Sequence, residues 1–283
     1  MGTQVAVVAA VAGIGAYAWY MRSSSKASAL DKPVFSSFGF HSLRLESTEL
    51  INHNTKKLRF ALPDADKPSG LSLTSALLTV SFPKGRWLPV LRPYTPVNDL
   101  NDPGHIDLMV KLYPNGKAST HLHSLKPGDT LTFAPIKELA WSPNKHDHVA
   151  LIAGGAGITP MYQLARGILH NPDDRTRVTL VWGVNTDEDI FLKDEFAALE
   201  AKHPGQFRAV YVVATPDAGS PHQKGFVTAQ VLEKAGLKAG EGKNQDIKVL
   251  VCGPPAMEKA LGGKKGTGVL AELGYRPDQI YSF

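Results

Sequence analysis

The segment LRPYTPV, Leu91–Val97, places an arginine and a tyrosine at alternate positions between two prolines. In an extended chain alternate side chains share a face, so Arg92 and Tyr94 are expected to point the same way. An arginine can donate two hydrogen bonds to one phosphate, and a tyrosine offers a ring and a hydroxyl. Because proline cannot donate to a strand ladder, Pro93 and Pro96 predict a sheet edge or a backbone left for a ligand. An ordinary edge strand with an exposed arginine is the alternative.

A glycine-rich turn, GGAGITP, follows the apolar run HVALIA and leads into a helical pattern. Glycines let a ligand approach the backbone, and a helix start offers free N–H groups to an anion. Pro160 suits the first turn of that helix. The turn, Gly154–Pro160, matches neither the GxGxxG fingerprint nor the P-loop, so neither is assigned. A turn with a structural role only is the alternative.

The single cysteine, Cys252, ends another apolar run and begins the sequence CGPP. Ligands of parallel sheets bind beyond the carboxyl ends of the strands, so CGPP is expected on the same rim as the glycine-rich turn. A buried core cysteine is the alternative. One cysteine excludes an internal disulfide, a cysteine-ligated zinc and an iron–sulfur cluster. No third ligand accompanies the His pairs of the sequence, so no metal site is predicted.

The elements that must position these motifs form two halves with different patterns. From Val34 to about Pro143, short alternating segments broken by Gly, Pro, Asn and Asp predict an antiparallel barrel or sandwich, with one helix over Ala118–Leu125. After Pro143, apolar runs alternate with helical patterns, which predicts a mainly parallel sheet covered on both faces. The helical spacing is carried by Met161, Leu164, Ala165, Ile168 and Leu169, and by Leu192, Phe196 and Leu199.

The composition is that of a globular protein long enough for two domains, with 283 residues of which 43% are hydrophobic and 20% charged. The net charge of +5 suits an acidic partner. It is too weak and too evenly spread to predict nucleic-acid binding.

The N-terminal run Val5–Met21 carries no charge over about 17 residues, which is the short end of a bilayer-spanning helix. Trp19 and Tyr20 suit an aromatic belt, and Arg22 follows directly. No basic region precedes the run and its end is bulky, which argues against a cleaved signal peptide. We therefore expect a single-pass anchor with the globular part on the cytosolic side, followed by a flexible tether, Ser23–Pro33.

Together, RPYTP, YPNGKAS (Tyr113–Ser119), GGAGITP, CGPP and the C-terminal phenylalanine resemble the flavin-dependent NADH-cytochrome b5 reductases of the ferredoxin reductase-like group. The resemblance extends over Val34–Phe283. The stretches GGKKGTGVLAELGY and PNGKASTHLHSLKPGDT are most similar to the fungal mitochondrial type. The resemblance implies an antiparallel FAD-binding β-barrel over residues 34–143 and a mainly parallel α/β NADH-binding domain over residues 144–283. Residues 1–33 are then the membrane anchor and tether.

The resemblance also implies a role for each motif residue. Arg92 is expected to bind the FAD pyrophosphate and Tyr94 to contact the flavin and ribityl chain. Thr95 is expected to hydrogen-bond near flavin N5, although strict alternation turns it away from the face of Tyr94. Thr95 and Cys252 are the expected catalytic residues, Cys252 by helping to position the nicotinamide. Further FAD or NADH contacts are expected from Pro93, Val110, Lys111, Tyr113, Gly116, Lys117, Ala118, Ser119, Gly154, Gly155, Thr159, Gly253, Pro254, Pro255 and Phe283.

The implied activity passes electrons from NADH, through hydride transfer to FAD, singly to cytochrome b5 or a similar haem protein. Two alternatives remain open: a related NAD(P)H-flavin reductase that uses a quinone or another small acceptor, and a tethered nucleotide-binding protein without catalysis. The resemblance favours a monomer in the mitochondrial outer membrane, with the endoplasmic reticulum membrane as the alternative location.

Three positions depart from the family pattern. Ala118 replaces the usual Met, a change that backbone contacts should tolerate. Ala156 replaces the usual Thr, so we expect a looser geometry for hydride transfer. Ala214 replaces an Asp that would bond the ribose 2'-hydroxyl and repel a 2'-phosphate, so we expect weaker discrimination against NADPH.

Overall fold

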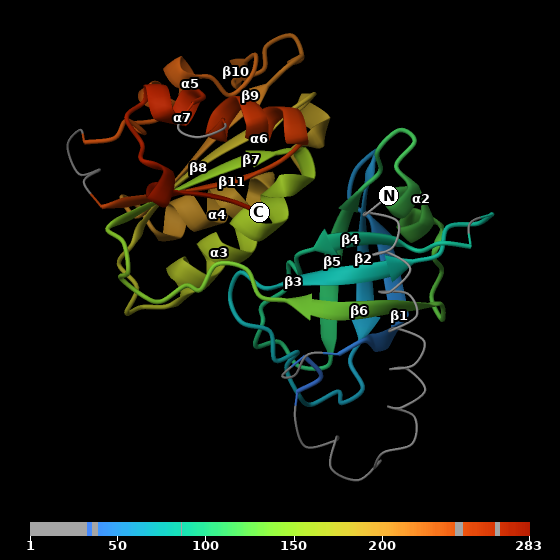
Figure 1. Ribbon diagram of the computed structural model, residues 1–283. Coiled ribbons are helices and arrows are strands. Elements are labelled where there is room, and N and C mark those ends of the chain that lie inside the picture. Colours follow the sequence, from blue (N-terminus) through green and yellow to red (C-terminus); the bar gives the residue numbers. More distant parts are fainter. Residues whose placement is uncertain (1–32, 36–38, 86, 241–245, 264–266) are drawn as a thin grey trace, which may run out of the picture. The chain divides into compact units, whose positions relative to one another are not determined.

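The computed structural model describes residues 33–35, 39–85, 87–240, 246–263 and 267–283 (Figure 1). Val34–Phe283 forms one unit that contains two six-stranded sheets. The membrane helix predicted at Val5–Met21 lies outside the described residues. Among the residues that are described, no helix combines the length and the apolar character needed to cross a bilayer.

The first sheet is antiparallel, with the strand order β4-β3-β6-β1-β2-β5. Its strands alternate between core and solvent, so that Leu43 and Leu45 of β1 are buried while the residues between and beside them are not. The helix α2 adds Leu122 to this core, where the rings of Phe60 and Phe133 meet edge to face. The elements are β1 (His41–Leu50), β2 (Thr55–Ala61), β3 (Ala76–Ser81), β4 (Val90–Tyr94), β5 (His105–Lys111), α2 (Lys117–Ser124) and β6 (Thr130–Ile136).

The predicted antiparallel architecture is confirmed, and the sheet that was predicted as a barrel or sandwich is a curled half-barrel. Within the described strands, β4 pairs only with β3 and β5 only with β2, which leaves both at an edge. Pro93 in β4 has no N–H to offer a further neighbour. Directly after β4 the chain crosses to the opposite edge of the sheet. There Val97 N–H donates to the carbonyl oxygen of Asp107 in β5 (2.9 Å).

The second sheet is parallel throughout, as predicted, with the order β10-β9-β8-β7-β11-β12. The order reverses between β7 and β11, which is where open parallel sheets bind ligands. The strands are β7 (His148–Gly154), β8 (Arg177–Val184), β9 (Phe207–Val213), β10 (Gln223–Lys224), β11 (Ile247–Cys252) and β12 (Ile280–Ser282).

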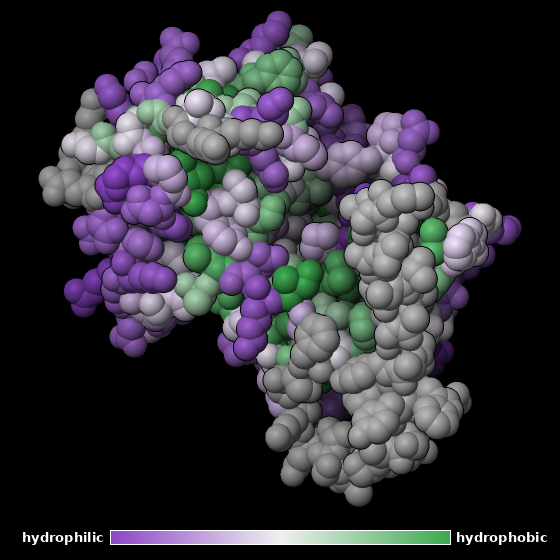
Figure 2. All heavy atoms as spheres, in the orientation of Figure 1, coloured by the Kyte–Doolittle hydropathy of each residue, from purple (hydrophilic) through white to green (hydrophobic). Residues whose placement is uncertain are grey.

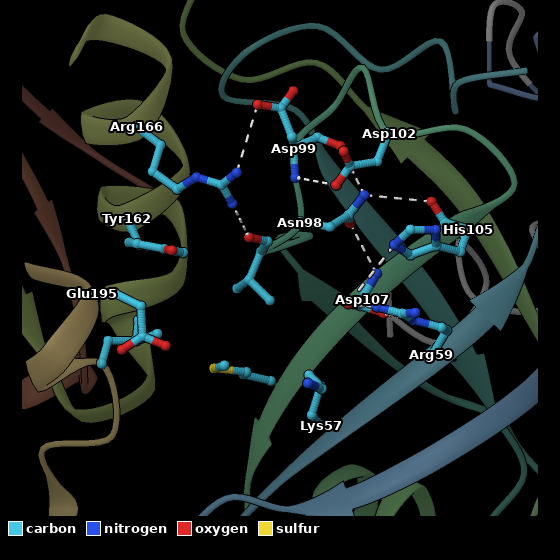
Figure 3. Close-up of a pocket in the computed structure, with 13 residues that line it drawn as sticks. Lys57, Arg59, Asn98, Asp99, Asp102, His105, Asp107, Tyr162, Arg166 and Glu195 are labelled. Atoms are coloured by element: carbon cyan, nitrogen blue, oxygen red, sulfur yellow. Dashed lines mark hydrogen bonds and ion pairs between the residues drawn. The ribbon is translucent and has the colours of Figure 1, made fainter. Parts of the chain in front are cut away.

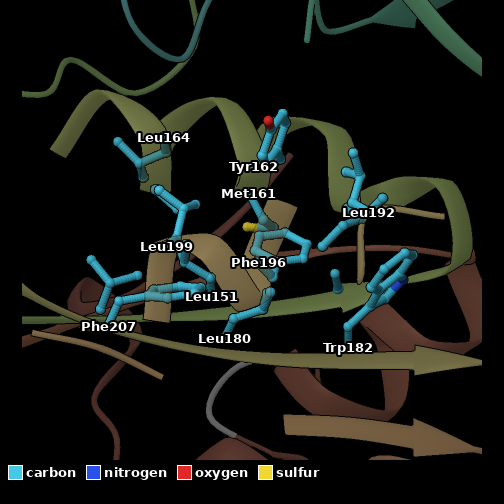
Figure 4. Packing of buried hydrophobic residues seen from close by; sticks show 14 of the residues in the cluster. Leu151, Met161, Tyr162, Leu164, Leu180, Trp182, Leu192, Phe196, Leu199 and Phe207 are labelled. Atoms are coloured by element: carbon cyan, nitrogen blue, oxygen red, sulfur yellow. The ribbon is translucent and has the colours of Figure 1, made fainter. Parts of the chain in front are cut away.

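Helices cover both faces of the parallel sheet, so neighbouring residues of one strand enter different cores. Leu151 of β7 joins the core under α3 and α4, whereas Ile152 joins the core under α5, α6 and α7. Figure 4 shows the first of these cores, with Met161 and Phe196 packed over the sheet. The remaining elements are η1 (Gly155–Gly157), α3 (Ile158–His170), η2 (Asp187–Asp189), α4 (Lys193–Lys202), α5 (Ala229–Lys234), α6 (Pro255–Gly262), α7 (Val269–Glu272) and η3 (Pro277–Gln279).

The described surface is polar with scattered apolar positions. On the face drawn in Figure 2, hydrophilic residues are interspersed with smaller hydrophobic areas. Among the described residues, the large apolar side chains with the greatest exposure are Trp87, Phe226, Leu50 and Phe82.

Candidate active site

The edge strand β4 presents Arg92 and Tyr94 at alternate positions, with Pro93 between them. Arg92 is exposed and donates from Nη1 to the carbonyl oxygen of Leu91 (2.8 Å), which occupies one of the five donors of its guanidinium. Tyr94 is half-buried, and burial, more than any neighbouring charge, raises the pKa of its phenol to about 12. A guanidinium and a protonated phenol are therefore available along one sheet edge.

Thr95 lies at the seam between the two edges of the half-barrel. The strand β4 ends at Tyr94, and the chain has reached β5 by Val97. Thr95 is buried, whereas Tyr94 is half-buried. The strand pairing of β4 therefore ends directly before Thr95. The contact of Thr95 with flavin stays a prediction.

A tight turn leads into α2 and leaves the start of the helix free for an anion. Ser119 Oγ donates to the carbonyl oxygen of Gly116 (3.1 Å) and accepts from Tyr113 N–H (3.3 Å). A Cβ on Gly116 would overlap Ser119 Oγ and lie 3.0 Å from the carbonyl oxygen of Tyr113, so the turn requires glycine. Gly116 caps α2 without a side-chain hydrogen bond, and α2 packs against β4. The N–H groups at Lys117 and Ala118 thus begin a helix beside the strand that carries Arg92.

The glycine-rich turn and the CGPP turn meet at the carboxyl ends of β7 and β11, as predicted. Cys252 is in register with Ala153 of the neighbouring strand. A Cβ on Gly157 would overlap the carbonyl oxygen of Cys252 and lie 2.9 Å from the backbone nitrogen of Gly253. A Cβ on Gly154 would lie 2.8 Å from Cδ of Pro254 and overlap the sulfur of Met257. Glycine is therefore required for the two turns to approach this closely.

The glycine-rich turn is also in contact with the first half of the chain. Ala156 N–H donates to the hydroxyl of Tyr113 (3.2 Å), and burial is the main reason that the pKa of this phenol is raised. Trp182 Nε1 donates to the carbonyl oxygen of Gly155 (3.0 Å), and Thr159 Oγ1 donates to that of Ala156 (3.2 Å). Side chains of both halves therefore hold the backbone of the glycine-rich turn, Tyr113 from the first half and Trp182 from the second.

Cys252 is a neutral thiol at the rim. Burial first, and then the charges of Glu258 and Glu138, raise the pKa of its thiol to about 12. Glu258 accepts a hydrogen bond from Gly253 N–H (3.1 Å), and α6 begins with proline at Pro255, where the missing N–H costs nothing. The side chain at position 252 can contact a ligand, but it is not poised as a nucleophile.

The C-terminal residue lies beside the same strand. Phe283 N–H donates to the carbonyl oxygen of Val251 (3.1 Å). The ring of Phe283 packs against that of Tyr281 at 5.1 Å between centroids and against the core under α3 and α4. This places Phe283 next to the carboxyl end of β11, and its contact with a nucleotide stays a prediction.

The two predicted residues of β5 are directed elsewhere by their side chains. Val110 is fully buried in the core of the half-barrel, and its carbonyl oxygen is 2.7 Å from His123 Nε2. The ammonium of Lys111 is buried and lies 2.7 Å from the carboxylate of Asp189 in η2. Val110 has no exposed surface, so the structure gives no support for its predicted flavin contact, and that of Lys111 stays a prediction.

Asp189 was missed by the sequence analysis, although it joins the two halves. Burial opposes its ionisation, but hydrogen bonds from Lys111 and Asn54 outweigh burial and hold the pKa of the carboxyl below its usual range. The amide of Asn54 donates to Asp189 Oδ1 (2.9 Å), and that of Asn52 donates to the carbonyl oxygen of Glu188 (2.6 Å). Locally Asp189 is only the last residue of a capping box, in which Thr186 N–H donates to its carboxylate (3.3 Å), and that motif gives no sign of Lys111 or Asn54.

Two domain families match the chain over the two sheets described above. The oxidoreductase FAD-binding domain matches residues 42–140, and the oxidoreductase NAD-binding domain matches residues 151–262. NADH-cytochrome b5 reductase 2 of Pyricularia oryzae is 46% identical over 299 residues, which cover 100% of this chain and 89% of the relative. That of Botryotinia fuckeliana is 51% identical over 254 residues, covering 87% of this chain and 72% of the relative.

The chain belongs to the NADH-cytochrome b5 reductase family. Among solved structures, the cytochrome b5 reductase domain of Ulva prolifera nitrate reductase matches with a TM-score of 0.78 at 28% identity, covering 89% of this chain and 100% of that one. The CS-b5R domains of human Ncb5or match with a TM-score of 0.72 at 21% identity, over 87% of this chain and 70% of that one, which supports the fold.

The residues present fit the two nucleotides expected in an NADH-cytochrome b5 reductase. The exposed guanidinium of Arg92 and the start of α2, which has no side-chain cap, suit the pyrophosphate of FAD. On the nucleotide side, glycines let the two rim turns pack directly against each other, and Ala214, directly after β9, donates its backbone N–H to the carbonyl oxygen of Val184 (3.0 Å). Neither Ala156 nor Ala214 offers a nucleotide a side-chain hydrogen bond.

Proposed function

We propose that the chain is an FAD-dependent enzyme that passes electrons from NADH to cytochrome b5. The observation that carries the proposal is the contact of the Tyr113 hydroxyl with Ala156 N–H (3.2 Å), which joins the flavin-side half to the nucleotide rim. Reaction between a flavin and a nicotinamide requires the two rings to be held against each other. A contact between the two binding halves at this point meets that requirement.

Bound FAD supplies the chemistry, because it takes two electrons from NADH as hydride and releases them one at a time to two haem irons. The chain binds and orients. Arg92 and the start of α2 hold the pyrophosphate, and the protonated phenol of Tyr94 donates to the flavin or ribityl chain. Cys252 keeps its proton and packs against the nicotinamide without reacting. No side chain has to act as an acid or base in this scheme.

The experiment is a titration of the purified protein. We expect a yellow protein whose flavin absorbance is bleached by one equivalent of NADH and restored by two equivalents of ferric cytochrome b5. Faster turnover with a quinone than with cytochrome b5 would transfer the proposal to the alternative acceptor. A colourless protein that binds no added FAD would end it. The net charge of +5 supports an acidic protein partner.

We further propose that Val5–Met21 anchors the protein as a single-pass helix in the mitochondrial outer membrane, and that the enzyme works as a monomer. The uncharged run and the basic residue that follows it support the anchor. Fractionation of cells that express a tagged chain would test the location, with recovery in the endoplasmic reticulum as the competing outcome. Light scattering of the detergent-solubilised protein would test the monomer.

A further inference from the structure

A buried glutamine on α3 links two loops of the flavin-side half. Gln163 is 4% exposed. Its Oε1 accepts a hydrogen bond from Thr74 N–H (2.8 Å), and its Nε2 donates to the carbonyl oxygen of Pro96 (3.1 Å). The side chain therefore uses both ends of its amide on backbone groups of the other half.

The two partners of Gln163 occupy special places. Pro96 directly follows Thr95 and the strand that carries Arg92. Thr74 has φ of 70°, a left-handed conformation that is costly for a β-branched residue and persists only where the surroundings enforce it. Its hydroxyl donates to the carbonyl oxygen of Leu139, in the segment between the two sheets. Gln163 thus holds the loop before β3 and the exit of β4 at once.

A second side chain of α3 supports the same segment one turn further on. Arg166 Nη1 donates to the carbonyl oxygen of Val97 (2.7 Å), while its Nη2 lies 3.6 Å from the carboxylate of Asp99. Figure 3 shows Arg166 reaching from the helix towards this segment across a pocket of about 230 Å³. Residues three apart share a helix face, so Gln163 and Arg166 bind successive carbonyls from one side of α3.

The helix α3 begins at Ile158, immediately after the glycine-rich turn. The helix α3 therefore begins at the nucleotide turn and, through Gln163, is hydrogen-bonded to the chain just after β4. Met161 and Leu164, on the two sides of this glutamine in sequence, are fully buried in the sheet core, which fixes the helix on the parallel sheet.

We propose that Gln163 is a positioning residue for hydride transfer, which rests on the function proposed above. In that step the C4–H bond of NADH breaks and its hydrogen moves with both electrons to flavin N5, leaving NAD⁺. The rate depends steeply on the distance between these atoms. Gln163 sets that distance by tying the segment after Thr95 to the helix of the nucleotide turn.

Gln279 provides a matched control. It is 8% exposed, accepts from Arg276 N–H (3.0 Å) and donates to the carbonyl oxygen of Ile247 (3.3 Å). It therefore makes the same pair of backbone bonds as Gln163, but both of its partners lie in the nucleotide half. Gln163→Met and Gln279→Met remove the same chemistry at the two places.

Stopped-flow reduction of the FAD-loaded proteins by NADH is the central measurement. For Gln163→Met we expect the limiting rate of flavin reduction to fall roughly 10- to 100-fold while the Kd for NADH stays within about threefold. Hydrogen exchange should quicken in the peptides that contain Thr74 and Val97, a readout independent of turnover. Gln279→Met should keep the wild-type reduction rate and the wild-type exchange of those two peptides.

Equal reduction rates for Gln163→Met and the wild type would overturn the inference, as would an equal loss of rate in both methionine variants. If Gln163→Met retains no FAD, hydrogen exchange of the apoproteins decides. The peptides that contain Thr74 and Val97 should exchange faster in Gln163→Met than in Gln279→Met, and wild-type exchange of these peptides in Gln163→Met would overturn the inference. Failure of NADH to reduce the wild-type flavin would instead refute the proposed function.

Discussion

The two rim side chains that could act as nucleophiles, Cys252 and Tyr281, stay protonated. Cys252 is half-buried beside Glu258, and its thiol pKa is raised to about 12, with burial as the largest cause. Tyr281 donates to Glu138 (2.6 Å), and burial first and then this hydrogen bond raise the pKa of its phenol to about 12. A rim of this kind can pack against a nicotinamide ring without offering it a nucleophile.

The thiol of Cys252 should therefore react slowly with alkylating reagents. At pH 8 the native protein should be modified by iodoacetamide roughly 1,000-fold more slowly than the urea-unfolded chain, because thiolate is the reactive form and the pKa is raised from 9.0 to about 12. The native rate should rise about tenfold per pH unit up to pH ~11, whereas the unfolded rate levels off above pH ~9. Similar rates for the two states at pH 8 would contradict a buried thiol.

Ala214 should weaken the choice between NADH and NADPH. It follows β9 at the carboxyl end of the parallel sheet, where an acid would face the ribose 2'-hydroxyl. We expect Ala214→Asp to raise the ratio of kcat/KM for NADH to that for NADPH by about tenfold or more, because the new carboxylate repels a 2'-phosphate. Steady-state kinetics with both nucleotides measure the ratio. A strong NADH preference that is the same in both proteins would rule the idea out.

At the scale of the elements, the two nucleotide turns depend on the absence of a side chain at Gly157. A Cβ there would overlap the backbone of Cys252, and a backbone cannot move aside as a flexible side chain can. Gly157→Ala should lower the free energy of unfolding by about 1–3 kcal/mol or more, as overpacking does, and should weaken NADH binding. Urea unfolding and calorimetric titration measure the two effects.

Gly262 is the control for this substitution. It also lacks a positive φ, and the nearest atom to its added Cβ would be Ser282 Oγ at 3.9 Å, an ordinary contact. Gly262→Ala lies in α6 and should change the unfolding free energy by less than about 1 kcal/mol, in the stabilising direction. Equal destabilisation by both alanines would show that crowding at Cys252 is not the cause.

Local sequence patterns predicted the strands and helices, but not whether the antiparallel sheet closes into a barrel. The prolines at Pro93 and Pro96 predict an edge strand, and β4 is one. Runs such as HVALIA predict strands buried on both faces, and β7 feeds two cores. Whether the antiparallel sheet closes depends on pairing between β4 and β5, strands that no short motif relates. The half-barrel is therefore determined by contacts between strands distant in sequence and not by a local motif.

The candidate site divides in the same way. The glycine-rich turn and CGPP could be placed on one rim because the ends of parallel strands share an edge. Asp189 and Gln163 could not be found, because each acts on residues of the other half and looks ordinary among its sequence neighbours. For Lys111 the sequence suggested a flavin contact, but it could not show that the ammonium lies 2.7 Å from a buried carboxylate of the other half.

At the scale of the whole described unit, polar contacts join the flavin-side and nucleotide-side halves. The Lys111–Asp189 pair, Asn54 and the Tyr113 hydroxyl all act between the two sheets. A buried ion pair costs desolvation but fixes one arrangement of the groups around it, and breaking it leaves a buried charge without a partner. We expect a fixed arrangement of the two halves to matter most where the flavin and nicotinamide rings must meet.

Asp189→Asn should therefore destabilise the protein strongly at neutral pH, by about 3–5 kcal/mol, because the buried ammonium of Lys111 loses its carboxylate partner. The folded-state pKa of Asp189 is lowered, so its stabilising contribution is complete above the unfolded pKa of about 3.9 and is lost as the pH falls through the folded value. The difference in unfolding free energy between wild type and Asp189→Asn should thus be constant from pH 5 to 7 and shrink below pH ~4. Urea unfolding across this range measures this difference.

The exposed Arg276–Asp278 pair (3.0 Å) is the control, and Asp278→Asn should have little effect on the unfolding free energy at any of these pH values. A difference for Asp189→Asn that does not change with pH would show that the carboxylate of Asp189 is not what holds the two halves together.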